Sequence, residues 1–420
     1  MWLHASLINF GYGGDTMDLV EILNESPLPT ELAFSEAEYA ARVAKTQARM
    51  VEDGIDVLII SSTPNLGYLT GYDCTMSCGY TIGILATTGD VALHASELEA
   101  PCALLFSTIR DIKQFYWYES EGTAVQLGQM LSDRGAGSKR IGLEMGNPET
   151  FACGAFDTES YLALVKALPD ASFVNATNLV LDVRMIKSAP EIAYMRKAGA
   201  LTGVGLKATL DVTAEGKTDN EIVAAGYGAM IAAGSELMSI DPMCTTGPRT
   251  GYMPHIPYKR FKLEQGHPIY LEYSGCYERY NAPGMRSACI GEPSDNLRRL
   301  SETSIKTLEL LLENIRPGRT GDDVAQVAKH GFDDAPEGVY FHGGYGYSIG
   351  MGFQPTWTEN PHYIAIGSET VLETGMAFHL PICTWVPADK IGIGFSESIA
   401  VTETGCEVLT ASGDRVLAIR

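Results

Sequence analysis

Basic residues are scarce in this 420-residue sequence: 30 Lys and Arg stand against 52 Asp and Glu, a formal net charge of −22. Such an acidic excess repels nucleic-acid phosphates and anionic membranes, which argues against both as partners. A small cation or zwitterion meets no such barrier. Long apolar runs are also missing, since none approaches the roughly 20 residues of a membrane-spanning helix. We therefore expect a small-molecule substrate, with no nucleic acid and no membrane as partner.

Signals of secretion, disulfide bonding and nucleotide binding are missing too. The first residues lack the basic and apolar segments of a signal peptide, and we expect residues 1–33 to be an extension, with Met17 a candidate start. Nine cysteines without a CxxC motif predict free thiols in a reducing cytoplasm, and no histidine lies near Cys74 and Cys78 to favour a zinc site. The glycines at 343–352 lack the Gly-Lys-Ser/Thr end of a P-loop.

The first half of the sequence alternates predicted helices and short apolar strands, joined by turn residues. The helices cover residues 35–53 and 157–168, and the strands cover 56–61, 80–86, 91–94 and 139–144. This alternation predicts an α/β domain, to which we assign residues 1–181.

The second half changes character at Ser188. Ser188 and Glu191 form a capping box that opens a long helix, and Pro190 fits its first turn. Similar signals start helices near Thr218, Ser294 and Thr320. Strands are expected at 268–273, 286–290, 375–380 and 395–401. Helices over antiparallel strands predict an α+β domain, to which we assign residues 182–420.

Three polar side chains in this half occur in apolar or rigid surroundings. Glu272 follows three apolar strand residues, and a buried carboxylate is costly unless it is functional or paired, here with Arg279 or Arg286. His255 lies between two prolines that hold the backbone extended. His379 alternates with apolar neighbours, a pattern typical of a core histidine as well as of a site residue.

Several motifs resemble, in order, the pita-bread family of creatinase, prolidase and aminopeptidase P. The motifs are Arg184-Met-Ile-Lys-Ser-Ala-Pro-Glu, His255-Ile-Pro, Gly346-Tyr-Ser-Ile-Gly-Met, Thr374-Gly-Met and Glu397-Ser-Ile-Ala-Val-Thr-Glu. The resemblance implies an α/β creatinase-like N-terminal domain followed by an α+β pita-bread catalytic domain.

Metallopeptidases of this family hold two metal ions with two Asp, one His and two Glu. The resemblance maps these ligands, in order, onto Glu272 or Tyr273, Pro283, Tyr347, Leu380 or Pro381, and Ser396 or Glu397. Hard dications need several carboxylate or imidazole ligands. The resemblance therefore implies a site with no metal ion, and we expect no cofactor.

Two metal-free hydrolases share this fold, and the motifs are most similar to the ectoine hydrolase branch. These motifs are Glu272-x-x-Gly, Arg279-Tyr-x-x-Pro-x-x-Arg, Gly346-Tyr-Ser-Ile-Gly and Pro355-x-Trp-x-Glu. The segment Gly71–Tyr80 departs from that branch, because it lacks an aromatic run after Tyr-Asp, and this leaves the exact substrate open. In this family the segment is a candidate substrate-contact loop that reaches across a homodimer.

The resemblance assigns catalytic roles to Glu272, His255 and Glu397. Glu272 would stabilise a cationic carbon and either activate water or attack directly, His255 would relay a proton to the departing nitrogen, and Glu397 would bind the cationic end of the substrate. Arg286 would hold Glu272 or pair with a substrate carboxylate. The candidate substrate-binding residues are Tyr347, His379, Arg286, Tyr280, Trp357, Glu359 and Tyr252.

The expected activity is metal-independent hydrolysis of a non-peptide C–N bond, at an amidine-like carbon of a small zwitterionic solute. Two alternatives stay open. One is an Xaa-Pro-type metallopeptidase or lyase of the same fold, and the other is an inactive scaffold that binds peptides. We expect a cytoplasmic homodimer whose N-terminal domain contributes to the partner's site.

Overall fold

The computed structural model describes residues 19–76, 79–116, 122–146, 156–252, 254–410 and 413–420. They form two compact units, one ending at Ala176 and the other running mainly from Thr177 to Arg420. Within these ranges no helix is long and apolar enough to span a membrane, and the seven cysteines are free thiols. Met17 and Cys78 lie outside the described residues, so the expectations about them stay predictions.

The first unit is built on a six-stranded sheet in the order β4-β3-β2-β1-β5-β6, with antiparallel pairing in β1–β2–β3 and parallel pairing elsewhere. Its helices are α1 (Leu19–Asn24), α2 (Glu36–Glu52), α3 (Thr63–Thr70), α4 (Ala100–Phe106), α5 (Thr123–Asp133) and α6 (Thr158–Ala167). Its strands are β1 (Val57–Ile60), β2 (Thr81–Ala86), β3 (Ala92–Ser96), β4 (Asp111–Phe115), β5 (Arg140–Leu143) and β6 (Ser172–Asn175). This confirms the predicted α/β fold class.

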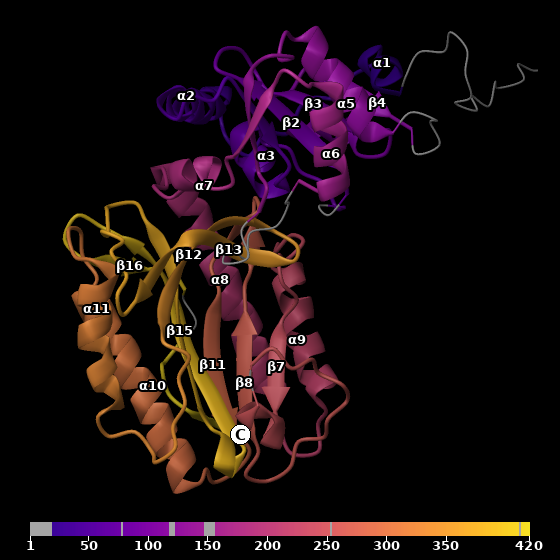
Figure 1. The fold of residues 1–420 in the computed structure, drawn as a ribbon. Helices are drawn as coiled ribbons and strands as arrows, with labels where there is room; N and C mark the ends of the chain where they lie inside the picture. Colours follow the sequence, from indigo (N-terminus) through magenta and orange to yellow (C-terminus); the bar gives the residue numbers. More distant parts are fainter. Residues whose placement is uncertain (1–18, 77–78, 117–121, 147–155, 253, 411–412) are drawn as a thin grey trace, which may run out of the picture. The chain divides into compact units, whose positions relative to one another are not determined.

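The second unit contains an eleven-stranded sheet with the central order β7-β8-β11-β15-β14-β12-β10-β9 (Figure 1). Its helices are α7 (Leu179–Arg184), α8 (Ala189–Val212), α9 (Asp219–Ala232), α10 (Asp295–Asn314) and α11 (Gly321–Ala328), with short 3-10 helices η1 (Gly247–Gly251), η2 (Lys329–Phe332) and η3 (Pro387–Asp389). Its strands are β7 (Met243–Thr246), β8 (Pro268–Tyr273), β9 (Cys276–Tyr277), β10 (Tyr280–Asn281), β11 (Gly284–Cys289), β12 (Gly344–Phe353), β13 (Thr356–Ala365), β14 (Ala377–Val386), β15 (Ile391–Val401), β16 (Cys406–Val408) and β17 (Ala418–Ile419). The predicted α+β class is confirmed.

Local signals explain where these helices begin. Ser188 and Glu191 form the predicted capping box of α8, and Thr218 and Glu221 form another at α9. Ser294 accepts the Leu297 N–H at the start of α10. Satisfying these early N–H groups is what makes Ser and Thr favourable at helix starts.

The apolar residues of the helices pack on one face of the sheet. Leu300 and Leu308 of α10 share a core with Leu380 of β14, and Leu206 of α8 shares another with Leu271 of β8. Because side chains alternate along a strand, the neighbours of these strand residues lie on the opposite face. The candidate site lies on that opposite face.

Candidate active site

Strand alternation places Glu272 on the sheet face opposite the helices. Ile269 and Leu271 pack into the helix-side core, so the side chains of Tyr270 and Glu272 lie on the other face. Met285 of β11 stands directly across from Glu272. The site is therefore organised by the pleat of the central strands and not by loops.

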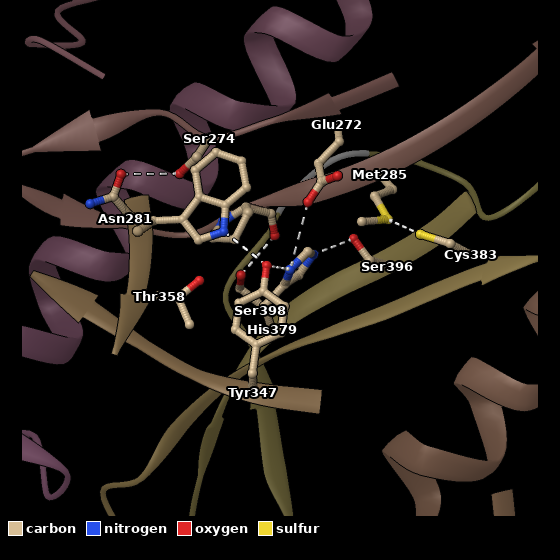
Figure 2. Close-up of polar contacts among 12 residues, drawn as sticks. Glu272, Ser274, Asn281, Met285, Tyr347, Thr358, His379, Cys383, Ser396 and Ser398 are labelled. Carbon is tan, nitrogen blue, oxygen red and sulfur yellow. Dashed lines mark hydrogen bonds and ion pairs between the residues drawn. The ribbon is translucent and has the colours of Figure 1, made fainter. Parts of the chain in front are cut away.

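Glu272 is buried, with only 3% of its surface exposed. The hydroxyl of Tyr270 donates to Oε2 of Glu272. The other carboxylate oxygen, Oε1, lies 4.0 Å from Nδ1 of His379 on β14 (Figure 2). Burial raises the pKa of Glu272 from 4.5 to about 7, and the hydrogen bond from Tyr270 opposes the rise only in part. The carboxyl group can therefore exchange a proton near neutral pH.

Glu272 differs in its neighbours from three other buried carboxylates of this unit, Glu359, Glu397 and Asp219. Glu359 accepts from Arg184 and Lys187, Glu397 pairs with two arginines, and Asp219 pairs with Arg249. Within the described part of the chain, no lysine or arginine pairs with Glu272 or contributes to its pKa. A buried carboxylate without a countercharge is unfavourable, and a bound cation would relieve that cost.

His379 joins Glu272 to a row of hydroxyl groups. Its Nδ1 lies 2.8 Å from the Tyr347 hydroxyl, and its Nε2 lies 2.7 Å from Oγ of Ser396 (Figure 2). The indole N–H of Trp357 donates to the Tyr347 oxygen at 2.9 Å. Burial lowers the pKa of His379 to about 3, so its imidazole is neutral at physiological pH.

The residues at the five expected ligand positions do not fit a dinuclear metal centre. Three of the five positions had two candidate residues. Tyr273 and Leu380 pack in the helix-side cores, and Glu397 follows Ser396 along β15. Because side chains alternate along a strand, Glu272, Pro381 and Ser396 are the candidates that lie on the face of the site. The resulting set is Glu272, Pro283, Tyr347, Pro381 and Ser396. The two prolines offer no side-chain donor. Nowhere in the described ranges do three His, Cys, Asp or Glu side chains form a group that could hold a metal ion.

The structure corrects the predicted placement of Glu397 and Arg286 beside Glu272. Nη2 of Arg286 lies 2.7 Å from Oε1 of Glu397, which also receives Nε of Arg415 at 2.9 Å. Arg286 stands opposite Leu271, and Glu397 stands opposite Leu380. Both therefore lie on the helix-side face, where Glu397 is already ion-paired and cannot receive the cationic end of a substrate at Glu272.

Two further predicted substrate contacts are engaged inside the protein. The hydroxyl of Tyr280 donates to Glu191 at 2.8 Å, which ties β10 to the start of α8. Glu359 is enclosed by Arg184, Lys187 and the N–H of Met351. Both side chains make buried internal pairs, and their predicted contacts with substrate stay predictions.

His255 and Tyr252 belong to the exposed segment after η1, where 68% of the Tyr252 surface is accessible. Burial lowers the pKa of His342, and the charge of His255 lowers it further. The ring centroid of His342 lies 6.3 Å from that of Trp385 on β14. No hydrogen bond joins the described residues His255 and Glu272. The roles of His255 and Tyr252 stay predictions.

Three members of the site were missed by sequence reasoning: Tyr270, Met285 and Cys383. The Cys383 sulfur lies 3.6 Å from the Tyr270 hydroxyl and 3.5 Å from the Met285 sulfur. Spacing would have found two of them, since Tyr270 is two positions from Glu272 and Cys383 is four from His379, which places each pair on one face of a strand. Met285 could be placed in the site only from the register of β11 against β8, which sets it opposite Glu272.

Comparisons with known proteins agree with this architecture. The model of metallopeptidase family M24 matches residues 193–403, and the Creatinase/Prolidase N-terminal domain matches residues 42–186. An uncharacterized hydrolase/peptidase of Sinorhizobium fredii is 33% identical over 395 residues, covering 91% of this chain and 97% of that protein. The ectoine hydrolase of Halomonas elongata is 30% identical over 403 residues, covering 91% and 97%. The solved Xaa-Pro dipeptidase of Bacillus anthracis has a TM-score of 0.77 at 21% identity, covering 91% of this chain and 100% of that one.

Proposed function

The chain belongs to metallopeptidase family M24, and on this premise we propose that it hydrolyses a non-peptide C–N bond at an amidine-like carbon of a small zwitterionic solute without a metal ion. Membership makes it a hydrolase of this family. The similarity to ectoine hydrolase supports the substrate class, and the donor-poor ligand positions support metal independence.

One observation carries the proposal: Glu272 is a buried carboxylate, and among the residues that the structure describes no lysine or arginine pairs with it. An amidinium carbon is already positively charged, so it supplies the missing countercharge and needs no Lewis acid to polarise it. A peptide carbonyl is neutral and supplies neither. Binding of the cation favours the ionised form of Glu272, and this prepares the carboxylate for reaction.

The reaction adds water across the amidine carbon and breaks one of its C–N bonds. Glu272 either takes a proton from the attacking water or attacks the carbon itself, with water then releasing the acyl group. In both routes the carbon gains the water oxygen and the departing nitrogen takes up a proton. Tyr270 holds Oε2 of Glu272, which leaves Oε1 as the reactive oxygen near His379.

Turnover of two substrate panels tests the proposal. Purified protein treated with EDTA is expected to hydrolyse a cyclic amidinium carboxylate at an undiminished rate, and Xaa-Pro dipeptides should not be cleaved with or without Mn²⁺. Dipeptide cleavage that EDTA abolishes and Mn²⁺ restores would instead establish the metallopeptidase alternative. Binding of peptides without turnover of either panel would establish the scaffold alternative.

A further inference from the structure

The hairpin of β12 and β13 is irregular where it carries two residues of the candidate site, Tyr347 and Trp357. The facing pairs are Tyr347 with Tyr363, Ile349 with Thr358, and Phe353 with Thr356. Between the first and second of these pairs the chain advances two residues along β12 and five along β13. Between the second and third pairs it advances four residues along β12 and two along β13. Such irregularities leave backbone groups without ladder partners and redirect side chains.

Three buried charged side chains occupy this irregular region, and we name Arg184, Lys187 and Glu359 the clamp. Glu359 lies on β13, Arg184 ends α7, and Lys187 precedes α8. Arg184 Nη2 donates to one carboxylate oxygen of Glu359 and Lys187 Nζ to the other. Each clamp residue is at most 5% exposed, so the ion pairs are shielded from water and salt.

The clamp binds the backbone of β12 within the stretch where its pairing with β13 is irregular. The N–H of Met351 donates to Glu359 at 3.0 Å, and its carbonyl accepts from Arg184. Gly350 lies directly against the carboxylate, since a Cβ there would stand 2.4 Å from Oε1 of Glu359. The clamp therefore sets the distance between the two strands at the irregularity.

Trp357 lies two residues before Glu359 and points its indole N–H at Tyr347. The Tyr347 oxygen accepts from Trp357, whose indole N–H can only donate. Among the described residues, the hydroxyl hydrogen therefore has Nδ1 of His379, 2.8 Å away, as its acceptor. The proton of the neutral ring then lies on Nε2, which donates to Ser396.

We propose that the clamp is a positioning device for His379: it fixes the β12–β13 irregularity, holds Trp357 on Tyr347, and thereby selects the His379 tautomer protonated at Nε2. Glu359, Arg184 and Lys187 are positioning residues that act through Trp357 and Tyr347 without touching substrate. The proposal depends on the proposed function only for its kinetic effect, because the tautomer can be observed in the free protein.

Histidine side-chain ¹⁵N NMR of the full-length protein at pH 7.5 tests this assignment, with the His379 signals identified by their loss in His379→Gln. The wild-type protein is expected to show one tautomer, unprotonated at Nδ1 and protonated at Nε2. Glu359→Gln is expected to give averaged shifts of both tautomers. Its kcat should fall roughly 10- to 100-fold, as for a misplaced reacting group, with KM within about threefold of wild type.

Asp219→Asn is the matched control, because Asp219 is another fully buried carboxylate paired with an arginine, Arg249 at 2.6 Å. It should lower stability and leave the His379 shifts and kcat unchanged. If Glu359→Gln does not fold, Trp357→Phe removes the indole donor to Tyr347 directly and is expected to give the same averaged shifts. A single Nε2-protonated tautomer retained in either variant would overturn the proposal. A wild-type protein that turns over no amidine but shows the shifts as expected would overturn only the proposed function.

Discussion

At the scale of single residues, the difference between Glu272 and its neighbours decides the chemistry. Glu397 and Glu359 are as deeply buried as Glu272, but each is paired with two positively charged side chains. Glu272 faces a phenol and a neutral imidazole. Of these three acids, Glu272 alone is left to act on a bound cation.

Glu272→Gln removes the ionisable group and keeps its size and shape. We expect kcat to fall at least about 100-fold, the lower limit for loss of a general acid–base or nucleophile. Glu264→Gln, at an exposed position of the same region, should retain wild-type kcat. Turnover by Glu272→Gln close to that of the control would show that the reaction uses another group.

Tyr270→Phe removes the hydrogen bond that partly opposes the raised pKa of Glu272. The pKa should rise further, and the acid limb of the kcat/KM profile should move to higher pH, because more base is then needed to ionise the carboxyl. Tyr273→Phe is the control, since the Tyr273 hydroxyl bonds Thr209 on the helix side. If the acid limb moved equally in both variants, the ionisation that it reports would not be that of Glu272.

At the scale of elements, the sequence predicted most of the framework. Capping residues marked the starts of α8, α9 and α10 correctly, and apolar runs marked β8 and β15, because these signals are local. The face of each strand residue depends on register, which the sequence does not give, and the prediction that Glu397 and Arg286 act beside Glu272 therefore did not account for their place on the helix side. The hairpin of β12 and β13 went unrecognised because its irregular pairing breaks the alternation that marks a strand.

Gly394 of β15 shows how closely the strands pack around the site. A Cβ at Gly394 would lie 2.5 Å from the Tyr270 ring and 3.2 Å from the Met285 sulfur. Gly394→Ala should therefore displace both side chains, cost about 1–3 kcal/mol of unfolding free energy, as for overpacking, and reduce kcat.

Gly228→Ala provides the comparison, because open space surrounds this exposed glycine of α9. It should raise the free energy of unfolding by roughly 0.5–1 kcal/mol through helix propensity. Denaturant unfolding and steady-state kinetics of both variants measure these effects. Unaltered stability and kcat in Gly394→Ala would contradict the close packing.

At the scale of the whole molecule, the site makes stability depend on pH. Below pH 4.5 the native and unfolded chains both hold the proton of Glu272. As pH rises from 4.5 to about 7 the unfolded chain releases it first, so Glu272 contributes a progressive loss of stability that is complete above pH 7. The protein keeps an acid there at a cost in stability, as is common for functional sites.

Glu272→Gln should therefore gain stability relative to wild type as pH rises. The gain between pH 4 and pH 8 should reach about 3 kcal/mol, at 1.36 kcal/mol per pKa unit. Other titrating groups are shared by the two proteins and cancel in the difference. Denaturant unfolding at both pH values measures it, and a difference that does not change with pH would contradict a raised pKa for Glu272.

The pKa of Glu272 itself, read from the ¹³C shift of its side-chain carboxyl and assigned by its absence in Glu272→Gln, tests the central claim most directly. We expect a value of about 7 in the free protein and a marked fall when a cyclic amidinium ligand binds. A value near that of an ordinary glutamate in the free protein, or one that the cation leaves unchanged, would contradict an acid held ready for a positively charged carbon.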